Sequence, residues 1–138
     1  MNDIKLPSSR WKRSNKSVFN IGYHLIWCPK YRRKVLVDGK DVRLKELLRE
    51  KANSMEWTIE SMEVMPDHVH LFVKAAPTDI PHWIVQQLKG YSSRMMREEF
   101  PDLKRRLPSL WTRSYFCGSV GHISEESVKK YIEDQKNK

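Results

Sequence analysis

Two histidines separated by one residue stand at the start of an apolar run, His68-Val69-His70-Leu71. The run has the pattern of a β-strand, in which residues two apart project from the same face. His68 and His70 therefore share one face, and Val69 and Leu71 belong to the core face. Two imidazoles this close can hold one metal ion, although the spacing equally fits two polar residues on a half-exposed strand. The other histidines lack such a partner and are predicted to be ordinary: His24, His82 and His122.

A tyrosine and a glutamine lie one helical turn apart near the C-terminus. Tyr131 and Gln135 are four residues apart, so a helix places them on the same face. Val128 and Ile132 flank that face, and a tyrosine beside such residues is usually part of a core. Gln135 is the unusual member, because an amide on an apolar stripe needs a hydrogen-bonding partner. A metal ion held by the histidine pair would supply one.

Cleavage of a phosphodiester by a side chain is the chemistry that such residues support. A tyrosine oxygen can attack phosphorus and stay attached, and the step can reverse because phenoxide is also a leaving group. The pKa of free tyrosine is about 10, so the neutral hydroxyl is a poor nucleophile at pH 7. A divalent cation offsets this by polarising the phosphoryl oxygen and stabilising charge in the transition state. We expect Mg²⁺ or Mn²⁺, with Mn²⁺ binding at least as well because imidazole is a softer ligand than Mg²⁺ prefers.

Hydrophobic periodicity predicts the elements that must position these residues. Pro66-Asp67 is predicted to be a hairpin turn, Asp79 the N-cap of a long helix and Ser124 the N-cap of a last helix. The predicted strands are residues 18–28, 57–65, 68–75 and 112–122, the predicted helices are 41–54 and 80–99, and 102–111 is a basic loop. The order β-α-β-β-α-β with an added C-terminal helix predicts an α+β, ferredoxin-like fold. Helices would cover one face of an antiparallel sheet and leave the other available for a site.

The charge of the chain indicates a polyanionic partner. Lys and Arg number 26 against 17 acidic residues, for a net charge of +9. No acidic residue lies between Asp3 and Asp38, and aromatic residues are interleaved with the basic ones there. Cations attract phosphates and aromatic rings stack on unpaired bases, although a solvated basic tail has the same composition. The candidate DNA contacts are Arg10, Arg13, Lys30, Arg32, Arg33, Lys34, Lys89, Arg94, Arg105 and Arg113.

A length of 138 residues fits one domain. Residues 1–16 are predicted to be a flexible basic arm and residues 17–138 a single domain. No run approaches the roughly 18 apolar residues of a membrane span, and the first residues lack the apolar core of a secretory signal. Two cysteines cannot form a disulfide framework, so a cytoplasmic protein is expected. A zinc site made by Cys28, Cys117 and the histidine pair is a further metal alternative, although the chain has no Cys-x-x-Cys spacing.

Two segments resemble those of a known family. The run Glu63-Val64-Met65-Pro66-Asp67-His68-Val69-His70-Leu71-Phe72 resembles the His-hydrophobic-His motif of HUH endonucleases. Together with Tyr131-Ile132-Glu133-Asp134-Gln135 it is similar to the small single-tyrosine (TnpA-type) transposases of bacterial and archaeal insertion sequences. Residues 23–32 and 111–116 are similar to that family too, so the resemblance spans roughly residues 18–136.

The resemblance implies a ferredoxin-like fold and a homodimer with two composite active sites. It implies that His68, His70 and Gln135 are metal ligands and that Tyr131 is the nucleophile. Cleavage of single-stranded DNA would leave a 5′-phosphotyrosine and a free 3′-hydroxyl, and hairpins near the element ends would be recognised. A metal-dependent transposase is expected, with no small-molecule substrate and no membrane partner.

Two other classes of protein fit part of the pattern. Replication initiators and relaxases carry the same histidine motif, but they are usually larger and many have a third histidine or a second tyrosine. A non-catalytic RNA-binding module on the same sheet would expose stacking aromatics on its central strands. This chain places His68 and His70 there instead.

Overall fold

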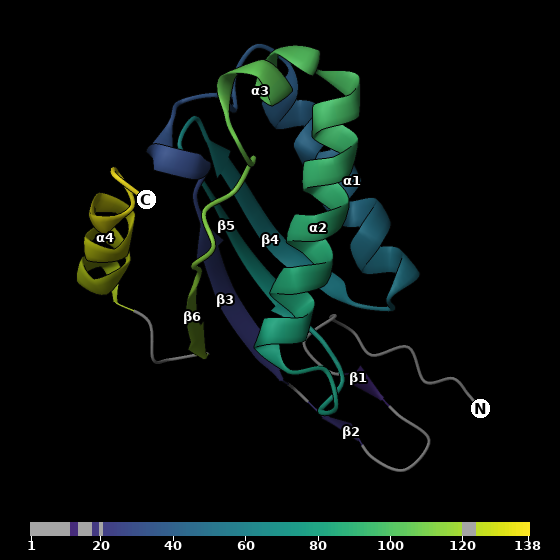
Figure 1. Cartoon of the computed structure of the whole chain (residues 1–138). Coiled ribbons are helices and arrows are strands. Elements are labelled where there is room, and N and C mark those ends of the chain that lie inside the picture. Colours follow the sequence, from purple (N-terminus) through teal and green to yellow (C-terminus); the bar gives the residue numbers. More distant parts are fainter. Residues whose placement is uncertain (1–11, 14–17, 20, 120–123) are drawn as a thin grey trace.

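Four strands form an antiparallel sheet (Figure 1). The computed structural model describes residues 12–13, 18–19, 21–119 and 124–138. In chain order the strands of this sheet are β3 (Gly22–Trp27), β4 (Thr58–Met65), β5 (His68–Lys74) and β6 (Phe116–Ser119). Their order in the sheet is β4-β5-β3-β6, so β3 and β5 are central and β4 and β6 lie at the edges. With the helices between them, this confirms the ferredoxin-like order.

Two long helices, α1 (Lys40–Ser54) and α2 (Pro81–Glu99), cover one face of the sheet (Figure 1). α1 buries Leu44, Leu47 and Leu48, which recur at the predicted helical spacing. Burial of apolar surface from both layers holds the helices on the sheet. The sheet contributes alternate residues of its central strands to this core: Leu25, Trp27, Val69, Leu71 and Val73. The residues between these positions project from the opposite face.

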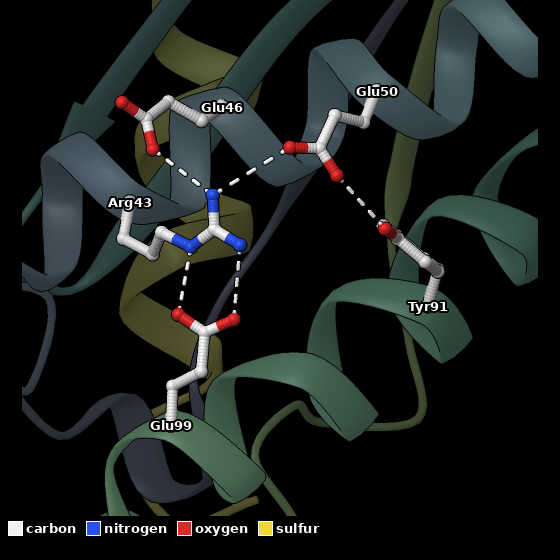
Figure 2. A network of polar contacts seen from close by, with 5 residues as sticks. All are labelled: Arg43, Glu46, Glu50, Tyr91 and Glu99. Carbon is white, nitrogen blue, oxygen red and sulfur yellow. Dashed lines mark hydrogen bonds and ion pairs between the residues drawn. The ribbon is translucent and has the colours of Figure 1, made fainter.

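A cluster of charged residues ties α1 to α2 at the surface (Figure 2). The Arg43 guanidinium donates to both carboxylate oxygens of Glu99, at 2.7 and 2.9 Å. It also contacts Glu46 at 3.0 Å and Glu50 at 3.5 Å. Glu50 in turn accepts from the Tyr91 hydroxyl at 2.9 Å. The two parallel bonds to Glu99 fix the guanidinium plane, so this cluster orders the helix layer that supports the sheet.

A short helix, α3 (Pro101–Arg106), forms where the sequence predicts a basic loop over residues 102–111. Pro101 occupies the first helical position, where its fixed φ suits the helix and its missing N–H is not needed. Leu103 is buried and anchors the helix to the core. Basic residues fill the last turn, where they complement the helix dipole. The prediction failed because a six-residue helix is too short to show a periodic pattern.

α2 begins without the predicted cap. Its N-cap is Ile80, which makes no side-chain capping bond, and the backbone N–H of Asp79 donates to Ala76 instead. Ile80 is 59% exposed and precedes the helix, whereas the predicted helix begins at this residue. Pro81 occupies the first turn, where its missing N–H is not needed. α2 is the longest helix among the described residues. None of the helices in these residues is long and apolar enough to cross a membrane.

The outer ends of the first and last predicted strands differ from the structure. β6 begins at Phe116 rather than at residue 112. The Thr112 N–H donates to the Cys28 carbonyl in an isolated bridge between Pro29 and Trp111, which is separate from the β3–β6 ladder. Residues 120–123, at the predicted end of this strand, lie outside the described residues. β3 begins at Gly22, whereas residues 18–19 form a separate strand, β2 (Val18–Phe19), that pairs with β1 (Lys12–Arg13). Of the predicted arm over residues 1–16 only β1 is described, and its boundary with the domain stays a prediction.

Candidate active site

The histidine pair projects from the sheet face opposite to α1 and α2. Along β5, buried apolar residues alternate with partly exposed ones, and His68 and His70 belong to the partly exposed set. The shared face predicted for the pair is therefore confirmed. His70 pairs with Ile26 of β3 on one side and with Glu63 of β4 on the other. Because paired residues project from the same face, this row continues from Ile26 to Phe116 of β6.

A third histidine, His24 of β3, lies beside the pair. Its Nδ1 is 3.2 Å from Nε2 of His70, and the ring centroids are 5.4 Å apart. Phe72 stacks on His24 at 4.6 Å and lies over Gly22, where a Cβ atom would come within 2.6 Å of the Phe72 ring. Burial lowers the pKa of His24 and of His70. Both rings are therefore neutral at pH 7.

His24 does not have the ordinary surroundings that the sequence predicts for it. Strand alternation was the available signal, since His24 is out of phase with Leu25 and Trp27, which point into the core. The contact with His70 depends on the β3–β5 register, which sets His24 opposite Phe72 and next to the His70 row. That register joins segments 46 residues apart and cannot be read from local spacing.

Asp67 connects His68 to the basic loop after β3. One carboxylate oxygen accepts from Nδ1 of His68 at 2.9 Å, and the other is 3.6 Å from Nε of Arg32. A carboxylate on one imidazole nitrogen fixes the ring and directs the other nitrogen, Nε2, towards a ligand. Nη1 of Arg32 also donates to the Ile132 carbonyl at 3.5 Å. The guanidinium therefore lies between the histidine strand and the helix that carries Tyr131.

That helix, α4 (Glu125–Asp134), lies beside β6 on the side of the sheet away from α1 and α2 (Figure 1). Ser124 is its N-cap, as predicted, and accepts from the Ser127 N–H at 3.1 Å. The Tyr131 ring packs against Phe116, with centroids 6.0 Å apart. α4 ends at Gln135, its C-cap. Contact with Phe116 places the tyrosine at the end of the row that contains His70.

Ser114 joins Tyr131 to Gln135. Its hydroxyl donates to Oε1 of Gln135 at 2.8 Å, and its oxygen is 3.1 Å from the Tyr131 hydroxyl. Because a serine has one proton to donate, the tyrosine hydroxyl is the donor in the second bond. Nε2 of Gln135 donates to the Tyr131 carbonyl at 3.1 Å. Gln135 is 3% exposed, and both the oxygen and the nitrogen of its amide are hydrogen-bonded. The sequence predicts that Gln135 needs a partner but contains no spacing that identifies Ser114.

Tyr131 is neutral at physiological pH. Burial raises the pKa of its hydroxyl to about 12. The hydroxyl must therefore lose or share its proton before it can act as a nucleophile.

Lys89 of α2 holds the segment that carries Ser114. Its ammonium donates to the Thr112 carbonyl and, at 3.1 Å, to the Ser114 carbonyl. The same segment is tied to the end of β3 by the bond from Thr112 to Cys28. Burial lowers the pKa of Lys89 to about 8. Lys89 is a candidate DNA contact on sequence grounds, and in this structure its ammonium is bonded to the backbone of the site.

Replacement of Lys89 by methionine should remove a pH-dependent component of stability. The pKa of Lys89 is about 8 in the folded protein, whereas an unperturbed lysine, as in the unfolded chain, has a pKa of 10.5. Between these two pH values the unfolded chain therefore binds more protons than the folded protein. The stability of wild type relative to Lys89→Met should therefore rise as pH increases from about 8 to about 10, by at most about 3 kcal/mol. Urea unfolding of both proteins across this range measures the difference. Lys45→Met, at an exposed position of α1, is the control, and parallel curves for wild type and Lys89→Met would contradict the assignment.

The two halves of the predicted metal site have separate hydrogen-bond partners among the described residues. Gln135 is bonded to Ser114 and Tyr131, and no hydrogen bond within the described residues joins it to His68 or His70. Within the same residues, no group of three or more His, Cys, Asp or Glu side chains is placed to share a metal ion. In this structure His70 contacts His24 and Tyr131 contacts Gln135, and Arg32 contacts both sides.

The zinc alternative disagrees with the positions of the cysteines. Cys28 is buried and Cys117 is exposed. Cys117 pairs with Leu25, so it projects from the sheet face that carries Leu25, opposite to the face of the histidine pair. A zinc site formed by the cysteines and the histidine pair is therefore excluded for the described residues.

The candidate DNA contacts differ in their surroundings. Arg32 is bound to Asp67, Lys30 lies 5.1 Å above the Tyr31 ring, and Arg94 contacts Glu98 at 3.9 Å. Arg10 lies outside the described residues, and only the backbone of Arg13 is described. The exposed members are Arg33, Lys34, Arg94, Arg105 and Arg113. Their contact with DNA stays a prediction.

A ferredoxin-like sheet with paired histidines on its open face and a tyrosine on an adjacent helix is the arrangement expected of a single-tyrosine transposase. The family model described as "Transposase IS200 like" matches residues 17–135. The chain belongs to this family. It is a transposase, an enzyme of DNA cleavage and strand transfer, and not a non-catalytic RNA-binding module.

Several relatives share most of the chain. The ISDra2 transposase TnpA of Deinococcus radiodurans is 41% identical over 129 residues, which cover 92% of each protein. The transposase for insertion sequence element IS200 of Salmonella typhimurium is 31% identical over 138 residues, covering 98% of this chain and 85% of the relative. A crystal structure from D. radiodurans, described only as that of a candidate transposase, superimposes with a TM-score of 0.81 at 39% identity, covering 90% of this chain and 97% of the other. The REP-associated tyrosine transposase, solved with a REP hairpin, shares the fold at 10% identity and a TM-score of 0.55, covering 88% of this chain and 68% of the other.

Proposed function

We propose that this transposase cuts and rejoins single-stranded DNA at the ends of an insertion sequence through a 5′-phosphotyrosine intermediate. Tyr131 is the nucleophile, and His68, His70 and Gln135 are ligands of a divalent metal ion. The contact of Ser114 with both Tyr131 and Gln135 supports this proposal most directly. It holds together the two residues to which the family resemblance assigns attack and metal binding.

The donor chemistry of the histidine face fits a divalent cation. Neutral imidazole is the form that binds metals, and burial keeps His70 neutral. Asp67 orients His68 through its other ring nitrogen. The Gln135 amide oxygen suits Mg²⁺ or Mn²⁺. To bind the same ion as the histidines, this oxygen would have to give up the hydrogen bond that it accepts from Ser114. When bound, the ion would polarise the phosphoryl oxygen and stabilise the charge of the transition state.

Tyr131 would form and break the bonds of the reaction. Its oxygen attacks phosphorus, a new P–O bond to tyrosine forms, and the bond to the 3′-oxygen breaks. The departing 3′-oxygen takes up a proton as the tyrosine loses one. In the reverse direction a 3′-hydroxyl attacks the phosphotyrosine and releases the tyrosine phenol. This step restores a phosphodiester and so rejoins the DNA. Ser114, which accepts the tyrosine proton in a hydrogen bond, holds the oxygen in position for this exchange.

Hairpin recognition and dimerisation belong to the same proposal. The resemblance implies that folded hairpins mark the element ends and that two copies of the chain form two composite sites. The REP-associated transposase was solved with a hairpin bound, so the shared fold is compatible with this kind of ligand. The net charge of +9 favours association with a folded polyanion.

One assay tests the proposed function. Wild-type protein is incubated with 5′- or 3′-labelled single-stranded DNA from the element ends, with Mg²⁺ or Mn²⁺ and with EDTA as the control. We expect a metal-dependent covalent adduct that carries the strand on the 3′ side of the cut, together with a free 3′-hydroxyl on the other fragment. An adduct on the opposite fragment, or cleavage without an adduct, would contradict the intermediate.

Replacement of Asp67 by asparagine should weaken metal binding while keeping the turn. Asparagine preserves the shape of the side chain but removes the charge that orients His68 and contacts Arg32. Loss of a carboxylate that orients a metal-binding histidine lowers metal affinity or activity roughly 10- to 100-fold. Titration of Mn²⁺ by calorimetry, without DNA, and the Mn²⁺ dependence of cleavage should both shift by this factor. Asp102→Asn, on α3, is the control, and an unchanged Mn²⁺ affinity for Asp67→Asn would refute the role.

A further inference from the structure

A basic cavity of about 810 Å³ lies beside the site, between three segments distant in sequence. The first is the loop after β3, which contains the short helix η1 (Lys30–Arg32). The second is the end of α3, and the third is the tail after α4. We call this cavity the basic pocket, and its lining residues are Tyr31, Arg32, Arg33, Lys34, Arg106, Lys136 and Asn137.

The charge of the basic pocket is left largely unneutralised. Five of its seven lining residues are Lys or Arg and none is acidic. Arg32 is paired with Asp67. The other four have no carboxylate within 4.0 Å among the described residues, whereas cations on the helix layer such as Lys40 and Arg43 are paired. Like charges gathered in a concave surface repel one another and attract a polyanion.

Tyr31 adds an aromatic surface to the rim of the basic pocket. Its side chain is 38% exposed, and the Lys30 ammonium lies 5.1 Å from the centre of its ring. The backbone at Tyr31 and Arg32 has φ values of 58° and 51°, in the left-handed region that disfavours residues with a Cβ. Such strain persists because the surrounding contacts hold it. The Lys30 N–H donates to the Leu110 carbonyl at 2.8 Å, and the Arg32 N–H donates to the Pro29 carbonyl at 2.8 Å.

We propose that the basic pocket binds backbone phosphates of single-stranded DNA next to the scissile phosphate, with Tyr31 stacking on an unpaired base. This inference rests on the proposed function, because it assigns the pocket to the same DNA strand. Cations combined with an exposed aromatic ring are the elements that bind single strands without reading their sequence. A duplex keeps its bases stacked inside and offers no face to Tyr31.

The position of the pocket links it to both halves of the site. Arg32 lines the pocket and contacts Asp67, which accepts from His68. Lys136 lines the pocket and directly follows Gln135 in the chain. A strand held in the pocket therefore lies between the histidine strand and the end of the tyrosine helix. The phosphates of one strand would then contact both the tail of α4 and the loop after β3.

Binding without cleavage tests the pocket. The probe is a fluorescent, unstructured oligothymidine strand in EDTA, measured by anisotropy over a range of salt concentrations. Arg106→Ala/Lys136→Ala should weaken binding roughly 10- to 30-fold at about 0.1 M salt, and should reduce the slope of log K against log salt by about 1.4, as expected for two lost phosphate contacts. The matched control is Lys45→Ala/Arg49→Ala, which removes the same charge from α1 and should change both quantities much less.

A second variant tests the stacking. Tyr31→Leu should weaken binding of the single strand with little change in its salt slope, and should leave binding of a duplex of the same length unchanged. Photo-cross-linking of a strand that carries 5-iododeoxyuridine should label Tyr31, as mapped by mass spectrometry. Equal losses for the pocket and control variants, or no label on the loop after β3, would overturn the proposal. Because these measurements need neither metal nor cleavage, a failed adduct assay with intact pocket effects would overturn the proposed function alone.

Discussion

Tyr131→Phe should abolish the covalent protein–DNA adduct and leave the binding of single-stranded DNA unchanged. Phenylalanine keeps the ring that packs against Phe116 and removes only the oxygen that attacks phosphorus. Loss of a nucleophile typically lowers a rate by roughly 10⁴-fold or more, so the adduct should fall below detection. Gel analysis of the labelled adduct measures the chemistry, and anisotropy with the same DNA measures binding. An adduct formed by Tyr131→Phe would place the nucleophile elsewhere.

Tyr115→Phe is the matched control for this experiment. Tyr115 follows Ser114 in the chain, and its hydroxyl lies 3.5 Å from Nδ1 of His82, on the side of α2 rather than of α4. Tyr115→Phe and Tyr131→Phe each remove one phenol hydroxyl and keep the ring. We expect this variant to form the adduct at close to the wild-type rate. A loss in both variants would indicate that the segment around Ser114, rather than the Tyr131 oxygen, limits the reaction.

His68→Ala is the second change for which we expect a very large effect. It removes an imidazole from the open face of β5 while its neighbour Val69 remains in the core. Cleavage should fall by about 10³-fold or more, because electrostatic stabilisation by an ion contributes several kcal/mol to the transition state. Binding of hairpin DNA should stay within about twofold, since metal-site and phosphate contacts are separate. Cleavage assays and anisotropy on the same preparation give both values.

His82→Ala provides the comparison for His68→Ala. His82 is an exposed histidine of α2, on the other side of the sheet, and its substitution should leave cleavage and binding unchanged. If His68→Ala loses hairpin binding to the same degree as cleavage, the histidine has a structural role instead. Mn²⁺ titration of His68→Ala separates the two cases further, because a lost ligand lowers metal affinity whether or not DNA is present.

The predicted histidine face and fold were accurate because they depend on strong local patterns. The alternation of His68 and His70 with Val69 and Leu71 needs only the two-residue period of a strand. The apolar residues of α1 likewise repeat with the helical period. Where the pattern is short the predictions failed, as at α3 and at the start of β6. Those segments are shaped by single tertiary contacts, such as the bond from Thr112 to Cys28.

The sequence by itself determined which residues are equipped for the chemistry: a histidine pair, a tyrosine and a glutamine one turn apart, and a basic chain. Tertiary structure alone decided their partners. It set His24 against His70 through the β3–β5 register and brought Asp67 and Arg32 together beside His68. It also placed Ser114 between Tyr131 and Gln135. The physical reason is that spacing along a strand or helix fixes only the direction of a side chain, whereas contacts between distant segments depend on strand register and on how the layers pack.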